Sequence, residues 1–127
     1  MAKIVLGNRP KSFKRVVKFQ LLEGGEGAIE CAYKYRTRSE FGEFIDRLMD
    51  AAGAKAKPEG EKFSMAELME RTAGANADYI MDVLDGWNLD AELTKSNIQQ
   101  LNDEYPAAAA AIMETYRLAC LEGRLGN

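Results

Sequence analysis

Apolar and polar residues alternate along two stretches near the start of the chain. Over residues 13–21, apolar side chains share one face with Arg15, while lysine and glutamine take the other face. Residues 29–35 repeat the alternation with isoleucine, cysteine and tyrosines on one face. A period of two with β-branched and aromatic residues is typical of half-buried strands. The glycine-rich residues 23–27 can supply a turn with positive φ, so the pattern predicts an antiparallel β-hairpin.

The spacing of apolar residues changes to three and four at Ser39, which is the spacing of helices that bury one face. Glycine, proline and small hydroxyl residues mark the ends of four helical segments. Their predicted bounds are residues 39–53 with a cap at Thr37 or Ser39, 64–86, a short helix from Thr94 or Ser96, and 106–123. The second segment contains Gly74, so it is either one interrupted helix or two helices.

These elements predict an α+β fold: an N-terminal antiparallel β-hairpin or small sheet packed against four to five α-helices. The chain has 127 residues, of which 46% are apolar, enough for one core. We expect a single domain over residues 1–127, with a β-rich basic part at 1–38 and a helical acidic part at 39–127. A further short strand is expected at residues 4–6. A loop over 54–62 is too short to separate two domains.

Charge is divided unevenly between the two parts. Residues 1–38 carry nine basic and three acidic side chains, a net +6, whereas residues 39–127 carry eight basic and seventeen acidic ones, a net −9. Opposite charge of this kind attracts within a molecule or between copies. A homo-oligomer is therefore one hypothesis, and internal pairing of the same charges is the alternative.

Catalytic chemistry has little support in the composition. The chain has no histidine, which removes the commonest general base and metal ligand, and its two cysteines stand far apart. The glycines at 24–27 lack the GK[ST] ending of a phosphate loop, and the acidic residues at 82–92 lack the dense alternation of a calcium loop. We therefore predict no enzyme, no cofactor and no metal site.

Membrane, export and nucleic-acid roles are also disfavoured. No apolar run approaches the ~20 residues that a membrane span needs, and the first residues lack a secretory pattern, so we expect a cytoplasmic protein. Basic residues of the hairpin alternate with phenylalanines, as in some nucleic-acid-binding surfaces. The net charge of −3 argues against that use.

Four residues of the helical part are candidates for binding a partner protein: Trp87, Leu89, Tyr105 and Tyr116. Trp87 is the sole tryptophan, and tryptophan is enriched among interface residues that dominate binding energy. Its alternative role is to close the core at the end of a helix. The alanines at 107–111 allow close packing either inside the molecule or at an interface, and the sequence does not choose between the two.

Three stretches together resemble the tail assembly chaperones of long-tailed bacteriophages. They are residues 9–19 (RPKSFKRVVKF), residues 33–41 (YKYRTRSEF), and the series of LDGWNL at 84–89, Tyr105-Pro106, Ala111-Ile112, Tyr116 and the ending GRLGN. None of them is a catalytic signature, and the resemblance rests on their order and spacing along most of the chain.

The resemblance implies a small α+β protein that binds the tape measure protein. It would keep that protein soluble while tail-tube subunits polymerise, with the tail-tube protein as a further partner, and then leave. Such a protein acts in the host cytoplasm and is absent from the mature virion. The alternatives are a structural protein of the virion, such as a tail-completion subunit, and a small nucleic-acid-binding protein that uses the basic hairpin.

Overall fold

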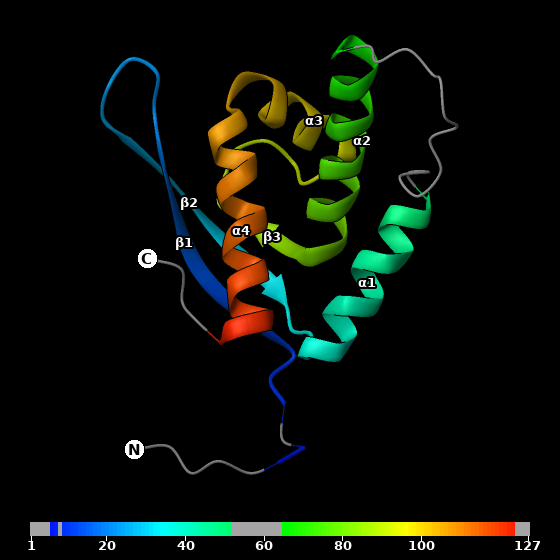
Figure 1. The fold of residues 1–127 in the computed structure, drawn as a ribbon. Coiled ribbons are helices and arrows are strands. Elements are labelled where there is room, and N and C mark those ends of the chain that lie inside the picture. Colours follow the sequence, from blue (N-terminus) through cyan, green and yellow to red (C-terminus); the bar gives the residue numbers. More distant parts are fainter. Residues whose placement is uncertain (1–5, 8, 52–64, 124–127) are drawn as a thin grey trace, which may run out of the picture.

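The two alternating segments pair as a hairpin in the computed structural model of the chain, which describes residues 6–7, 9–51 and 65–123 (Figure 1). Strand β1 (Ser12–Gln20) is antiparallel to β2 (Glu26–Lys34), with Ser12 opposite Lys34 and Gln20 opposite Glu26. Odd-numbered residues of both strands face the helices, and those of β2 from Ile29 to Tyr33 are buried. The predicted hairpin is confirmed.

A third strand, β3 (Leu84–Trp87), extends the sheet in the order β1-β2-β3. It is antiparallel to β2, with Trp87 opposite Cys31 and Leu84 opposite Tyr33. Beyond its end, the Asn88 N–H donates to the Glu30 carbonyl at 3.1 Å. The prediction of helix up to Gly86, within the helical acidic part, is wrong for residues 84–86, which form a strand. The backbone N–H and C=O groups of these residues form hydrogen bonds with the free edge of β2 instead of within a helix.

Four helices follow the predicted segments: α1 (Arg38–Ala51), α2 (Met65–Val83), α3 (Lys95–Glu104) and α4 (Pro106–Glu122). Thr37 rather than Ser39 caps α1 and Thr94 caps α3, each by accepting a backbone N–H three residues on. Helix α2 continues through Gly74 without a break. Gly123 ends α4 with a φ of 63°.

Three predictions lie wholly or mainly outside the described residues. These are the short strand at residues 4–6, the loop over 54–62 and the start of the second helix at Ser64.

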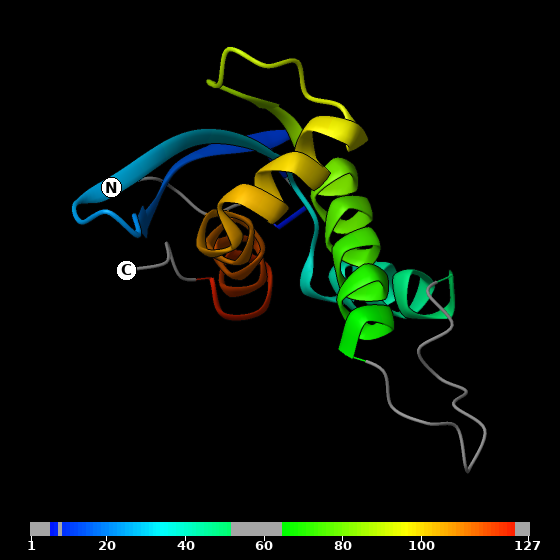
Figure 2. The same ribbon diagram turned by 90° about the horizontal axis from the view of Figure 1, so that it is seen from above.

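The helices lie on one side of the sheet (Figures 1 and 2). Helix α4 lies against the hairpin, and α1 and α2 pack on α4 from the other side. The core between these layers is rich in aromatic rings. We call this set the aromatic core: Phe13, Tyr33, Phe41, Phe44, Tyr79 and Tyr116.

Each tyrosine hydroxyl of the aromatic core donates to a backbone carbonyl. Tyr33 donates to Ile112 at 2.8 Å, Tyr79 to Met113 at 3.2 Å, and Tyr116 to Lys34 at 2.8 Å. Burial raises the pKa of all three phenols above the ordinary value. The hydroxyls therefore stay neutral, and each finds its acceptor on a segment far away in the sequence.

Two ion pairs connect the basic and acidic parts within one molecule. Arg9 pairs with Glu40 at 3.2 Å, and Arg36 pairs with Asp82 at 3.4 Å. Internal pairing thus uses some of the segregated charge. Three lysines of the sheet, on the face away from the helices, remain exposed: Lys14, Lys18 and Lys34.

Candidate functional site

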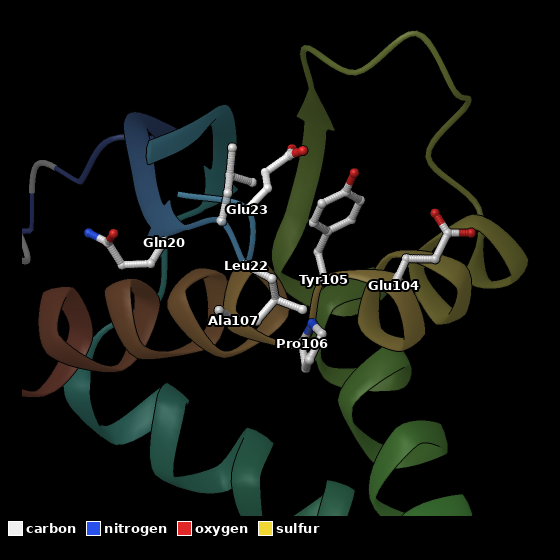
Figure 3. Close-up of a pocket in the computed structure, with 8 residues that line it drawn as sticks. Gln20, Leu22, Glu23, Glu104, Tyr105, Pro106 and Ala107 are labelled. Carbon is white, nitrogen blue, oxygen red and sulfur yellow. The ribbon is translucent and has the colours of Figure 1, made fainter. Parts of the chain in front are cut away.

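A pocket of about 260 Å³ opens between the tip of the hairpin and the link from α3 to α4 (Figure 3). We call it the hairpin-tip pocket. Its walls come from two segments more than 80 residues apart in the sequence, and they are mainly apolar. The lining residues are Gln20, Leu21, Leu22, Glu23, Glu104, Tyr105, Pro106 and Ala107.

The hairpin tip is built by a tight turn that holds Leu22 outward. The Leu21 N–H donates to the Gly25 carbonyl and the Gly24 N–H donates to the Leu21 carbonyl, both at 3.1 Å. Gly24 and Gly25 have φ values of 96° and 88°, a region that other residues rarely adopt. The Leu22 side chain is consequently fully exposed at one side of the pocket.

Tyr105 is fixed between two helices. Its N–H donates to the Leu101 carbonyl of α3 at 2.7 Å, and its carbonyl accepts from the Ala108 N–H of α4 at 2.9 Å. Pro106, the first residue of α4, further restricts the backbone at Tyr105. The residue is 46% exposed, so a rigid backbone presents an aromatic side chain to solvent.

Phe19 joins the two walls below the surface. Its ring lies edge-on to the Tyr105 ring, with centroids 6.4 Å apart. On the neighbouring strand, Gly27 leaves the space in which the Phe19 ring lies. A Cβ at residue 27 would come within 2.7 Å of two ring atoms. This glycine therefore permits the contact that connects the hairpin to the α3–α4 link.

Carboxylates stand at the rim of the pocket. Glu23 comes from the hairpin and Glu104 from the end of α3, where Glu104 accepts a hydrogen bond from Gln100 at 2.8 Å. No group of three or more metal-ligating side chains occurs among the described residues. The arrangement suits an apolar side chain whose neighbours are polar or basic.

The four residues expected from the sequence to bind a partner do not form one surface. Tyr105 lines the hairpin-tip pocket, whereas Tyr116 is fully buried and has no surface to offer a partner. Trp87 and Leu89 are half-buried and pack against the core, and the Trp87 Nε1–H donates to the Ala91 carbonyl at 2.8 Å. Sequence reasoning did not single out Leu22, although a leucine next to the glycine-rich turn at residues 23–27 was a signal.

The alanines at 107–111 divide between the two roles that the sequence left open. Ala108 and Ala109 are fully buried, so they let α4 pack closely within the molecule. Ala107 lines the hairpin-tip pocket. The run therefore serves mainly internal packing, and one end of it contributes to the exposed pocket.

Exposed apolar side chains that gather at a concave site, as Leu22 and Tyr105 do here, mark a candidate interaction surface, and the class that they define is a binding protein. Comparison with protein families agrees with this class: the model of the phage tail assembly chaperone family matches residues 1–127, the whole chain. The chain therefore belongs to that family, and the resemblance seen in the sequence is confirmed. Neither the curated proteins nor the solved structures include a significant match. Among the described residues, no helix has the length and apolarity to cross a membrane.

Proposed function

We propose that this chaperone binds the tape measure protein of its phage and keeps it soluble until tail-tube subunits surround it. Family membership supports a role in tail assembly. Before tail-tube subunits polymerise around it, a long tape measure protein would expose apolar surface. Covering that surface requires binding but no chemical reaction. On this proposal the chain acts in the host cytoplasm without catalysis, meets the tail-tube protein as a second partner, and is absent from the mature virion.

The observation that carries the proposed site is the pairing of Leu22 with Tyr105. Five large apolar side chains are exposed among the described residues: Leu6, Val16, Leu22, Met81 and Tyr105. Two of the five line one cavity, and both are held by fixed backbone. Exposed apolar residues that gather at a concave site mark interaction surfaces. We infer that the hairpin-tip pocket takes apolar side chains of the tape measure protein.

Co-expression with the gene for the tape measure protein tests this function. The chaperone is expected to raise the soluble fraction of that protein and to co-purify with it. Leu22→Asp places a charge in the pocket and Tyr105→Ala removes one wall. Each should weaken binding by roughly tenfold or more while leaving thermal stability nearly unchanged.

Val16→Asp is the matched control, because it places the same charge on an exposed apolar residue of the opposite sheet face. Equal losses for Leu22→Asp and Val16→Asp would remove the pocket from the proposal. A tape measure protein that stays insoluble with the wild-type chain would refute the proposed function. Finding the chain in purified particles by mass spectrometry would favour a structural protein of the virion.

A further inference from the structure

Arg15 occupies an unusual place on β1. It lies on the face that packs against the helices, between Phe13 and Val17 and opposite the buried Cys31. An arginine at such a position is normally paired with a carboxylate, because burying an unpaired charge is unfavourable. Among the described residues, Arg15 has no carboxylate partner.

The guanidinium of Arg15 is held in place but not fully bonded. Its Nη1 donates to the Lys14 carbonyl at 2.7 Å, and its central carbon lies 5.3 Å from the centroid of the Phe13 ring. Its Nε is buried and has no hydrogen-bond partner in the part of the chain that the structure describes. A buried donor without an acceptor is uncommon in folded proteins and calls for an explanation.

Arg15 lines a second pocket, of about 200 Å³, at the opposite end of α4 from the hairpin-tip pocket. We call it the arginine pocket. Its lining joins the start of the hairpin, the link from β2 to α1 and the last turn of α4. The lining residues are Pro10, Phe13, Arg15, Tyr35, Arg36, Ala119, Cys120 and Gly123.

A second arginine of this pocket is fully engaged. The Arg36 guanidinium donates from Nη1 to the Tyr116 hydroxyl at 3.1 Å, pairs with Asp82 and lies 4.3 Å from the centroid of the Phe44 ring. Arg9 adds positive charge nearby, since its guanidinium lies 5.7 Å from the centroid of the Tyr35 ring. Aromatic rings and guanidinium groups thus surround a cavity in which Arg15 alone among these three arginines lacks an anionic partner within the described residues.

We propose that the arginine pocket binds a carboxylate side chain, Asp or Glu, of the tape measure protein. The planar guanidinium offers paired donors that match a carboxylate, and the cavity has room for one acidic side chain. A nucleic acid fits the pocket less well, because a phosphate backbone is bound by several free cations. Arg9 and Arg36 are already paired with Glu40 and Asp82, which leaves Arg15 for a single carboxylate. This inference rests on the proposed function and adds a polar anchor to it.

The two pockets set a spacing for the partner. About twelve residues of α4 separate Ala107 from Ala119, which corresponds to roughly 18 Å along a helix. A partner segment that fills both pockets would therefore carry an apolar and an acidic side chain about twelve positions apart if it is helical.

Binding at the arginine pocket can be measured on the wild-type chain without its partner. The probe is N-acetylglutamate amide, compared with the neutral N-acetylglutamine amide, and the readout is the NMR signal of the Arg15 Nε–H. We expect the acid to shift this signal and the amide to leave it unchanged. Equal effects of the two probes would overturn the carboxylate site, and a larger shift with a single-stranded oligonucleotide would assign the site to nucleic acid.

Co-purification with the tape measure protein tests the occupant. Arg15→Gln should weaken that complex by about tenfold, whereas Lys14→Gln, which removes the same charge from the opposite sheet face, should not. Arg15→Lys keeps the charge without the planar fork and should fall between the two. Thermal midpoints of the variants confirm that the fold is intact.

The outcomes separate this inference from the proposed function. If the tape measure protein binds Arg15→Gln as well as wild type, the acidic anchor is refuted while the proposed function stands. If the wild-type chain does not bind that protein but the Arg15 signal responds to the acid, the proposed function fails, and the tape measure protein is not the occupant.

Discussion

Two tyrosines only eleven residues apart show how differently this molecule uses its aromatic side chains. Tyr116 lies in the aromatic core, fully buried, and its hydroxyl donates to the Lys34 carbonyl. Tyr105 stands before α4, half in solvent, and its ring touches Phe19 on one side while the other faces the hairpin-tip pocket. The sequence analysis gave both tyrosines as candidates for binding a partner protein. Burial assigns Tyr116 to stability and leaves Tyr105 available to a partner.

The largest expected effect lies in the aromatic core. Phe44 is 2% exposed and contacts Phe41 and Tyr79, so Phe44→Ala should lower the free energy of unfolding by about 3–5 kcal/mol. Tyr105→Ala should lower it by less than about 1 kcal/mol, because that ring is exposed. Denaturant titration of both variants checks the contrast. A loss under about 1 kcal/mol for Phe44→Ala would contradict the place of Phe44 in the aromatic core.

Trp87 is half-buried, and its substitution tests whether the side chain contributes to stability or to partner binding. It packs against the core and its indole N–H donates to Ala91, so Trp87→Ala should cost about 2–3 kcal/mol of stability. The affinity of the Trp87→Ala variant for the tape measure protein, measured below the unfolding transition, should stay near that of wild type. Lost affinity with an intact fold would return Trp87 to the binding surface that the sequence suggested.

Gly27 affects both stability and the hairpin-tip pocket, because it leaves space for the Phe19 ring that contacts Tyr105. In Gly27→Ala the Phe19 ring must move away from the new methyl group, at a cost of about 1–2 kcal/mol. Because Phe19 contacts Tyr105, affinity for the partner should fall as well. Gly42→Ala, in an open part of α1, is the matched control: it should raise stability by about 0.5–1 kcal/mol through helix propensity and leave affinity unchanged. Affinity equal to wild type in Gly27→Ala would mean that Phe19 does not support the pocket.

The smallest expected effect concerns alkaline pH. Burial raises the pKa of the Cys31 thiol to about 12, from an ordinary value of 9.0, so the folded state keeps its proton where the unfolded state loses it. Stability from this residue is complete below about pH 9 and is lost as pH rises towards 12. Between pH 8 and pH 10 the free energy of unfolding should fall by about 1 kcal/mol. Cys31→Ala should show a smaller fall, and an equal one would exclude the thiol as its source.

Local pattern accounts for most of the elements that the sequence predicted correctly. The hairpin, α1 and α4 follow from alternation, helical spacing, the Thr37 cap and Gly123. Strand β3 was missed because Val83, Leu84 and Trp87 also fit a helical face. Its conformation is decided by the free edge of β2, more than 50 residues earlier in the chain.

The candidate site was less visible in the sequence than the fold, because it too depends on contacts between residues far apart in the chain. Tyr105 was proposed as an aromatic residue of the helical part, and the structure places it in the lining of the hairpin-tip pocket. The role of Leu22 depends on the α3–α4 link lying beside the hairpin tip, which no local pattern encodes. The anomaly at Arg15 was visible in the alternation of β1, but its missing partner became apparent only when α4 was placed.

The bonds from the tyrosines of the aromatic core also set the order in which the chain can fold during synthesis. Tyr33 reaches Ile112 across 79 residues, and Tyr116 reaches Lys34 across 82. The inner face of the hairpin lacks its cover until α4 has left the ribosome. We therefore expect a nascent chain that stays incompletely folded until then and closes in one late, cooperative step.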